Sequence, residues 1–582
     1  MSAAARTIAA DVRSGRTSAE TVATEALARI AAYDAVQPQA WISRFPPEAV
    51  LAAARAVDAR VAAGDDLPLA GVPFAVKDNI DVAGLPTTAA CPSFAFAPGG
   101  NAFVVQRLLD AGAICLGKTN LDQFATGLNG TRSPHGAPRC VFHLDYVSGG
   151  SSSGSAVAVG AGLVPFALGT DTAGSGRVPA AFNGLVGLKP SKGRWSTSGL
   201  LPACRSLDCI TVFARDAEDA ALVDEVVAGF DPADAYARRL ADRAVSRRVG
   251  VPLAANCPWF GDVEAEYLHG KALERLASLG FELIEVDIAP LLEAARLLYD
   301  GPWVAERTAA MGDVLAKMPD AIDPTVRGIV EAGLGMSAVD AFRGQYRLAE
   351  IARHAEAMWD NIDMLAVPTS PTIYRVREML ANPVALNSHF GTYTNFVNLL
   401  DMAAIAVPAG YRRNATGYGI SFFAPAGTDR ALLGVAREWL DDLPDNRPPL
   451  DLEGKMDRIR LAVVGAHLKD MPLHWQLTSR DAVLVAETET APTYRLYAMA
   501  DSVPPKPALA WDAAGAAIKV EVYELDVAAF GSFVAEVPPP LAIGTVMLAD
   551  GSSVKGFVAE PRALAGAEDI TGFGGWRAWC AR

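Results

Sequence analysis

The sequence predicts an α/β protein in which helices cover a largely parallel or mixed sheet, followed by a smaller β-rich domain. Short apolar strands alternate with helical stretches between residues 66 and 225, as expected where helices pack on a sheet. A charged, proline-rich segment beginning at Asp441 has the composition of a linker. The 582 residues also exceed what a single hydrophobic core usually organises.

The first domain is expected over residues 1–440, the linker over 441–457 and the second domain over 458–582. Residues 1–35 carry apolar residues at helical spacing and predict one amphipathic helix without the features of a signal peptide. Residues 102–111 predict a helix, and residues 226–440 are mostly helical. The apolar runs expected to form strands are residues 71–76, 163–168, 364–368, 403–408, 459–464 and 518–523.

Composition excludes several classes of function. The net charge is -15 and no block of Lys and Arg is long enough to follow a phosphate backbone, so nucleic acid is not an expected partner. No run of about 20 apolar residues predicts a membrane span. The seven cysteines are scattered, which favours free thiols in a reducing, cytoplasmic compartment. The histidines form no metal-binding motif, and no cofactor is expected.

Two pattern matches lack the context that their chemistry needs. Residues 112–119 fit the phosphate-binding loop G-x-x-x-x-G-K-[ST], but the residues between the glycines read as a strand. Residues 150–154 fit the nucleophile elbow G-x-S-x-G, but the preceding residues are too polar for a central strand. We therefore favour neither nucleotide binding nor a Ser-His-Asp hydrolase.

Three other elements occur in an informative order. Lys77 ends an apolar strand, where loss of hydration would lower its pKa until it could act as a base. A Gly- and Ser-rich stretch over residues 149–160 leads into a helix, and a second one over residues 169–177 follows a strand. Taken singly, a lysine on the surface and a flexible loop explain the first two elements equally well.

Taken together, these elements resemble the amidase signature family. The resemblance rests on the segments Gly71-Val-Pro-Phe-Ala-Val-Lys-Asp, Gly117-Lys-Thr-Asn, Gly149-Gly-Ser-Ser-Ser-Gly-Ser, Gly169-Thr-Asp-Thr-Ala-Gly-Ser-Gly-Arg and Gly187-Leu-Lys-Pro-Ser. It implies an amidase signature fold with Ser175 as nucleophile, Ser151 as bridging serine and Lys77 as base. It also implies a pocket position at Gly127 and a cis peptide bond between Gly150 and Ser151.

The family resemblance places an oxyanion hole on the backbone N–H groups of the loop that carries Ser175. Its expected members are Thr172, Ala173 and Gly174, together with the N–H of Ser175. Such donors stabilise the negative charge that develops on the carbonyl oxygen during acyl transfer. Asp171 and Arg177 flank the nucleophile and are expected to brace the loop.

Two further resemblances narrow the substrate. Residues 299–307 resemble a segment of allophanate hydrolases in which Tyr299 and Arg307 would hold a small anionic substrate, since an arginine can clamp a carboxylate. A structural ion pair of Arg307 is the alternative. The implied reaction converts allophanate to ammonia and carbon dioxide. Hydrolysis of another small acyl amide, beside a structural C-terminal domain, is the alternative function.

Residues 461–475 resemble the C-terminal domain of allophanate hydrolases, itself similar to γ-glutamyl cyclotransferase-like folds. This domain would either assist decarboxylation of N-carboxycarbamate, with His467 and His474 as candidate proton carriers, or serve as a structural module. A homodimer is expected from the resemblance alone.

Overall fold

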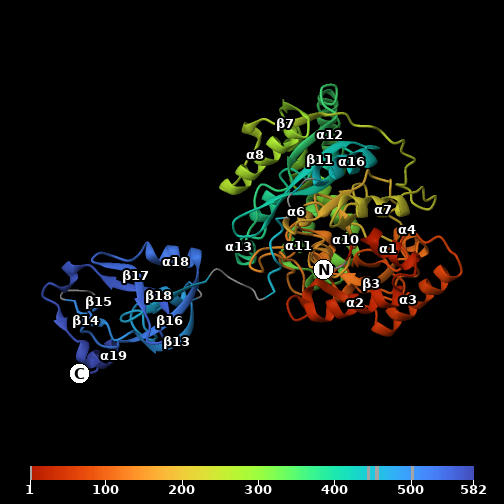
Figure 1. Ribbon diagram of the computed structural model, residues 1–582. Helices are drawn as coiled ribbons and strands as arrows, with labels where there is room; N and C mark the ends of the chain where they lie inside the picture. The colour runs from red at the N-terminus through yellow and green to blue at the C-terminus, as the bar shows by residue number, and fades with distance from the viewer. Residues whose placement is uncertain (1–2, 442, 444–445, 453–457, 481, 500–503) are drawn as a thin grey trace. The chain divides into compact units, whose positions relative to one another are not determined.

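The computed structural model describes residues 3–441, 443, 446–452, 458–480, 482–499 and 504–582. The chain divides into two compact units, residues 1–454 and 455–582 (Figure 1). The predicted linker, residues 441–457, lies partly outside the described residues. No helix within those ranges is long and apolar enough to cross a membrane.

A mixed sheet forms the centre of the first unit, and the described residues supply eleven strands to it. β2 is parallel to both β3 and β4, whereas β10 and β11 are antiparallel. The α/β fold class with a mixed central sheet is therefore confirmed. Across the sheet the strands are β1 (Trp41–Arg44), β3 (Ile114–Thr119), β2 (Pro73–Lys77), β4 (Phe166–Asp171), β6 (Cys209–Ala214), β5 (Val186–Lys189), β10 (Met402–Tyr411), β11 (Gly417–Pro425), β9 (Met364–Pro368), β7 (Arg248–Pro252) and β8 (Glu282–Val286).

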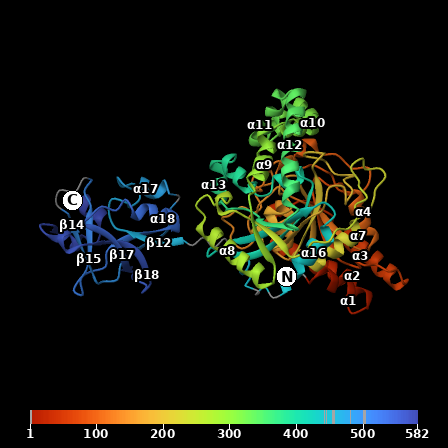
Figure 2. The same cartoon turned by 90° about the horizontal axis from the view of Figure 1, so that it is seen from above.

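Helices surround this sheet, and α9 to α12 stand together as a group in Figure 2. Helix α5 lies wholly in the interior, since all of its residues are buried. The helices of the first unit are α1 (Ala5–Arg13), α2 (Ala19–Tyr33), α3 (Pro47–Ala62), α4 (Phe103–Asp110), α5 (Ser153–Gly160), α6 (Val178–Phe182), α7 (Ala217–Val227), α8 (Val263–Ser278), α9 (Ala289–Asp300), α10 (Trp303–Lys317), α11 (Pro324–Ala332), α12 (Ala338–Met358), α13 (Val376–Ala381), α14 (Ala385–Phe390), α15 (Phe396–Leu399) and α16 (Asp429–Asp441).

The prediction of a single helix over residues 1–35 is wrong, because two helices, α1 and α2, occupy this region. Gly15 has a φ of 73°, in the left-handed region that ends α1. Ser18 then caps α2 by accepting the N–H of Thr21. The turn signal was present in the sequence as Ser14-Gly15, followed by a capping serine.

Strand positions follow the apolar runs closely, with one informative shift. β9 coincides with the predicted residues 364–368. The run predicted at 163–168 becomes β4, which begins later at Phe166 and continues to Asp171. Gly162 adopts a φ of 71° and turns the chain just before this strand. The shift extends β4 to the polar residues Thr170 and Asp171, which precede the loop between β4 and α6 that carries Ser175 (the nucleophile loop). β3 occupies the interval between Gly112 and Lys118, which rules out a phosphate-binding loop there.

The second unit is small and β-rich, as predicted. Its apolar core gathers on a sheet with strand order β13-β16-β12-β18-β17, beside a smaller sheet of order β15-β14-β19. Its strands and helices are β12 (Arg458–Val463), α17 (Trp475–Thr478), β13 (Val483–Glu489), β14 (Tyr494–Ala498), β15 (Pro507–Trp511), β16 (Lys519–Asp526), α18 (Val527–Val534), β17 (Leu541–Met547), β18 (Ser553–Ala559), β19 (Glu568–Asp569) and α19 (Trp576–Cys580).

Candidate active site

Lys77 is the last residue of β2 and lies in the interior of the first unit. Its side chain is fully buried, so the alternative of a solvated lysine is wrong. Burial lowers the pKa of Lys77 to about 7, and the carboxylates of Asp122, Asp208 and Asp171 oppose this effect in part. A lysine with this pKa is substantially neutral at physiological pH and can accept a proton.

Two serines extend from Lys77 in a hydrogen-bonded line. Lys77 Nζ lies 2.8 Å from Ser151 Oγ, and Ser151 Oγ lies 2.9 Å from Ser175 Oγ. Ser151 precedes α5, while Ser175 lies in the loop between β4 and α6. The Gly150–Ser151 peptide bond is cis, which confirms that prediction. The line joins a base to a hydroxyl nucleophile through a second hydroxyl.

Thr170 is a further member of this cluster that sequence reasoning missed. Lys77 Nζ donates to Thr170 Oγ1 at 2.7 Å. Thr170 lies on the part of β4 that the sequence did not assign to the strand, and β2 pairs directly with β4. The threonine therefore fixes the direction of the Lys77 amine from the neighbouring strand.

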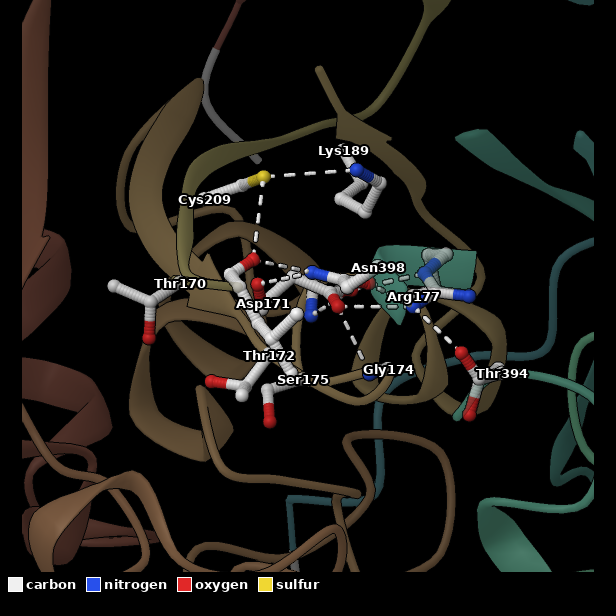
Figure 3. Close-up of polar contacts among 12 residues, drawn as sticks. Thr170, Asp171, Thr172, Gly174, Ser175, Arg177, Lys189, Cys209, Thr394 and Asn398 are labelled. Atoms are coloured by element: carbon white, nitrogen blue, oxygen red, sulfur yellow. Dashed lines mark hydrogen bonds and ion pairs between the residues drawn. The ribbon is translucent and has the colours of Figure 1, made fainter. Parts of the chain in front are cut away.

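The nucleophile loop is held from behind by Asp171. This buried carboxylate accepts N–H groups from Gly174 and Gly176, and it forms an ion pair of 2.9 Å with Arg177. Burial alone would raise the pKa of Asp171, but the Arg177 guanidinium outweighs it and holds the pKa below its usual value. Figure 3 shows the Ser175 hydroxyl turned away from this ion pair.

A residue more than 200 positions later in the sequence completes this support. Asn398 Nδ2 donates to the backbone oxygens of Asp171 at 2.8 Å and Leu207 at 3.0 Å. Arg177 also donates to Thr394 O at 3.2 Å (Figure 3). The loop is therefore bound to the chain around α15, and its shape is set before any substrate arrives.

The N–H groups of the loop divide into two sets. That of Gly174 is donated to Asp171 Oδ1 at 2.9 Å, so it is engaged in bracing the loop. Those of Thr172, Ala173 and Ser175 have no acceptor among the described residues. Thr172 Oγ1 donates to the buried carboxylate of Asp208, whose pKa burial raises to about 6. The open N–H groups belong to the same short loop as the Ser175 hydroxyl.

Gly127 lies in a loop that the buried Asp122 organises. Asp122 accepts the N–H groups of Asn129, Gly130 and Arg132. A Cβ at Gly127 would lie 2.5 Å from Asp122 Oδ2, so only glycine lets the loop close on this carboxylate. This packing gives a structural reason for the glycine that the sequence singled out.

Tyr299 near the end of α9 contacts Arg307 on α10. Arg307 donates to the Tyr299 hydroxyl at 3.3 Å and to Thr126 Oγ1 at 3.1 Å, and its guanidinium lies over the Tyr299 ring. Arg307 is 1% exposed, and within the described part of the chain no carboxylate lies within ion-pair distance of it. Its Nε has no acceptor there either. The alternative, in which Arg307 forms a structural ion pair, is therefore wrong within the part of the chain that the structure describes.

The two histidines of the second unit occupy different environments. The His467 ring stacks on Phe557 and also contacts Phe533, and burial lowers its pKa. His474 Nε2 lies 3.1 Å from the hydroxyl of Tyr523, which donates to Glu521 Oε2 at 3.0 Å. His467 Nε2 lies 2.7 Å from Gln476 Oε1, and Gln476 Nε2 donates to Glu536 Oε2 at 3.2 Å. Both histidines thus belong to hydrogen-bonded chains, but the connecting group is an amide beside His467 and a hydroxyl, which can both give and take a proton, beside His474.

No group of three or more metal-ligating side chains was found among the residues that the structure describes. The groups that the first unit offers for chemistry are its serines, its lysine and its open N–H groups. A buried base, a hydroxyl relay and free backbone donors around one serine together define a serine hydrolase of the acyl-transfer class.

Comparison of the sequence with known protein families identifies the family of each unit. Residues 22–433 match the Amidase family, and residues 459–581 match the allophanate hydrolase C-terminal domain. The chain belongs to the amidase family, and it joins an amidase domain to an allophanate hydrolase C-terminal domain. It is therefore an amidohydrolase acting on C–N bonds.

Two relatives cover both domains. The chain is 44% identical to urea amidolyase of Saccharomyces cerevisiae over 569 residues, covering 93% of this chain but 31% of that protein. It thus spans about a third of the length of the first curated relatives it matches. The solved structure of Kluyveromyces lactis allophanate hydrolase is 42% identical, with a TM-score of 0.70 and 97% of each chain covered. A glutamyl-tRNA(Gln) amidotransferase component of Prochlorococcus marinus is 36% identical and matches 67% of this chain and 88% of its own length.

Proposed function

We propose that this protein hydrolyses allophanate, the carboxylate of urea, through an acyl-enzyme on Ser175. The observation that carries the proposal is the buried Arg307, which has no carboxylate within ion-pair distance among the described residues and belongs to the same unit as the Lys77–Ser151–Ser175 line. The buried Asp208, which accepts from Thr172 in the loop that carries Ser175, acts electrostatically on Arg307 from a longer distance. A guanidinium in this position is complementary to a substrate carboxylate. The likeness to the Kluyveromyces lactis allophanate hydrolase supports the same substrate.

In the proposed acylation, Ser175 Oγ attacks the urea carbonyl carbon of allophanate. The Ser175 proton passes to Ser151, whose own proton passes to neutral Lys77. The carbonyl oxygen becomes an anion and is stabilised by the open N–H groups of Thr172, Ala173 and Ser175. The C–N bond then breaks, and the leaving nitrogen departs as ammonia after taking a proton from the relay.

In the proposed deacylation, a water molecule gives its proton to the same relay and attacks the ester carbon. The bond from this carbon to Ser175 Oγ breaks, and the proton returns to Ser175. The product is N-carboxycarbamate, which carries a carboxylate at each end. Arg307 and Tyr299 would hold the carboxylate that allophanate already had, so the carbon that reacts stays next to Ser175.

The substrate assignment can be tested with ammonia release from allophanate, biuret, malonamate and a simple acyl amide. The proposal predicts a strong preference for allophanate. Comparable turnover of simple acyl amides would instead support the alternative, an amidase for another small acyl amide. The homodimer and the cytoplasmic location expected from the sequence remain predictions, the first of which sedimentation of the purified protein can check.

The pH dependence of acylation should follow Lys77. Its pKa is lowered to about 7, and only the neutral amine can accept the proton. We expect kcat/KM to be low below pH 6, to rise through pH 7 and to level off above pH 8. The measurement is the initial rate of ammonia release across this range. A rate that falls as the pH rises from 6 to 8 would show that the base is another group.

We propose a second reaction for this protein, the decarboxylation of N-carboxycarbamate, and assign it to the C-terminal unit. The observation that favours it is the chain from His474 through Tyr523 to Glu521. In this step the bond between nitrogen and one carboxylate carbon breaks, carbon dioxide leaves, and the nitrogen takes a proton delivered by His474. The buried, stacked His467 is the weaker candidate, because burial lowers its pKa and its Nε2 is bonded to the amide of Gln476 and not to a hydroxyl.

The His474→Ala variant should separate the two reactions. We expect release of the first ammonia at the normal rate, whereas carbon dioxide should appear about 100-fold more slowly, the usual contribution of a positioned acid. Stopped-flow detection of both products makes the comparison, and the exposed His354 of the first unit, changed to alanine, is the control. Unchanged release of carbon dioxide would favour a purely structural unit.

A further inference from the structure

A cavity of about 630 Å³ opens beside Tyr299 in the first unit. Much of its wall is apolar and comes from α10, α11 and the loop around Leu128, whereas Arg132, Asn387 and Asn395 supply polar groups. Allophanate has seven heavy atoms and needs on the order of 200 Å³, if each atom takes the volume of about one water molecule. The cavity therefore has room for a ligand in addition to one bound at Arg307.

Arg132 is the buried cation of this cavity, with 2% of its surface exposed. Its guanidinium donates to the backbone oxygens of Thr126 at 2.9 Å and Pro383 at 2.6 Å. Its Nε has no acceptor among the described residues, and none of the carboxylates in that part of the chain lies within ion-pair distance. Two of its five N–H groups are thus paired, and both of their acceptors are uncharged.

Neither of the two acidic groups near Arg132 neutralises its positive charge through an ion pair. Asp122 acts on the guanidinium from a longer distance, and its oxygens already accept three backbone N–H groups. Asp300 also lines the cavity, but it is exposed to solvent, where its charge is screened. A buried cation with free donors is costly without an anion, so the cavity is suited to a carboxylate.

Asn395 supplies the complementary acceptor. It is 8% exposed, and its Oδ1 has no donor among the described residues. The preceding residue, Thr394, is tied to Arg177 through its backbone oxygen, which fixes this segment to the nucleophile loop. An amide oxygen in this position can accept an N–H of a urea or primary amide.

We propose that this cavity is an outer binding subsite for small carboxylates that carry an amide or urea N–H, with Arg132 binding the carboxylate and Asn395 the N–H. Arg132 and Arg307 both bind Thr126, the first through its backbone oxygen and the second through Oγ1. The two buried cations are thus joined through one residue, and each can hold an anion in its own place. This matters for a protein of net charge -15, whose overall field repels anions.

The inference rests on the proposed function for the ligand class, so its test measures binding and not turnover. The probe is malonamate, which has one carboxylate and one primary amide. Calorimetry uses the full chain carrying Ser175→Ala and Arg307→Gln, so that the inner site is disabled. We expect this protein to retain one binding site for malonamate, and adding Arg132→Gln should weaken binding at least about tenfold.

Two further variants complete the design. Asn395→Leu should weaken malonamate but leave propionate, which has no N–H, unchanged. Asp300→Asn should strengthen malonamate binding, and this arm remains informative if the Arg132 variant does not fold. Absence of malonamate binding once Arg307 is changed, or binding indifferent to both Arg132 and Asp300, would overturn the outer subsite. Neither result bears on whether allophanate is the substrate of Ser175.

Discussion

Changing Ser175 to alanine is expected to lower kcat for allophanate by at least about four orders of magnitude. The variant loses the atom that would form the acyl-enzyme, whereas Lys77, Ser151 and the open N–H groups remain. In serine hydrolases that work through such a relay, the residual rate comes from binding and oxyanion stabilisation alone. Ammonia release under saturating substrate measures the effect.

Ser153 offers a matched control for this experiment. It is a buried serine two residues beyond Ser151, and its hydroxyl makes a single long hydrogen bond of 3.4 Å to Asn120 O. Ser153→Ala should keep activity within a few-fold of the unchanged protein. Substantial turnover by Ser175→Ala, in a preparation free of the natural enzyme, would mean that another group attacks the substrate.

Arg307→Gln should give the second largest effect, and it should depend on the charge of the substrate. Glutamine keeps a hydrogen-bonding group but removes the cation, so the carboxylate of allophanate loses its charge-assisted partner. Such contacts contribute about 2–4 kcal/mol, and we expect kcat/KM for allophanate to fall roughly 30- to 1000-fold. A neutral acyl amide should be affected by less than threefold.

The control for Arg307 is Arg296 on the neighbouring α9, which is exposed. Arg296→Gln removes the same charge from the protein without touching the site, and kcat/KM should stay the same. If Arg307→Gln lowers turnover of charged and neutral substrates equally, the arginine supports the local structure and does not select the substrate.

Local patterns in the sequence were enough to predict the strands, whereas the residues of the serine line were predicted from the resemblance to the amidase signature family. β9 and β2 follow apolar runs, Lys77 ends the second of these, and Ser151 and Ser175 lie in short Gly-rich segments. The helix break at Gly15 was missed because periodicity was weighed above the turn residue. Strand pairing and burial could not be read from these local patterns, so only the structure resolved the alternatives left open for Lys77.

Contacts between distant segments account for what was missed. Thr126 binds both Arg132 and Arg307, and the second of these lies 181 residues away. Asn398 reaches the nucleophile loop across 227 residues. No spacing rule relates such residues, since their proximity depends on how α9, α10 and α15 pack. In the sequence, the one indication that Thr126 belongs to the site is its position next to Gly127.

The attachment of the nucleophile loop to Asn398 has a consequence for biosynthesis. During translation the loop leaves the ribosome long before Asn398 does, and domains generally fold as units once their chain is complete. Until that asparagine emerges, the carbonyl groups of Asp171 and Leu207 lack the donor that joins them. We therefore expect hydrolase activity only after nearly the whole amidase domain has been made.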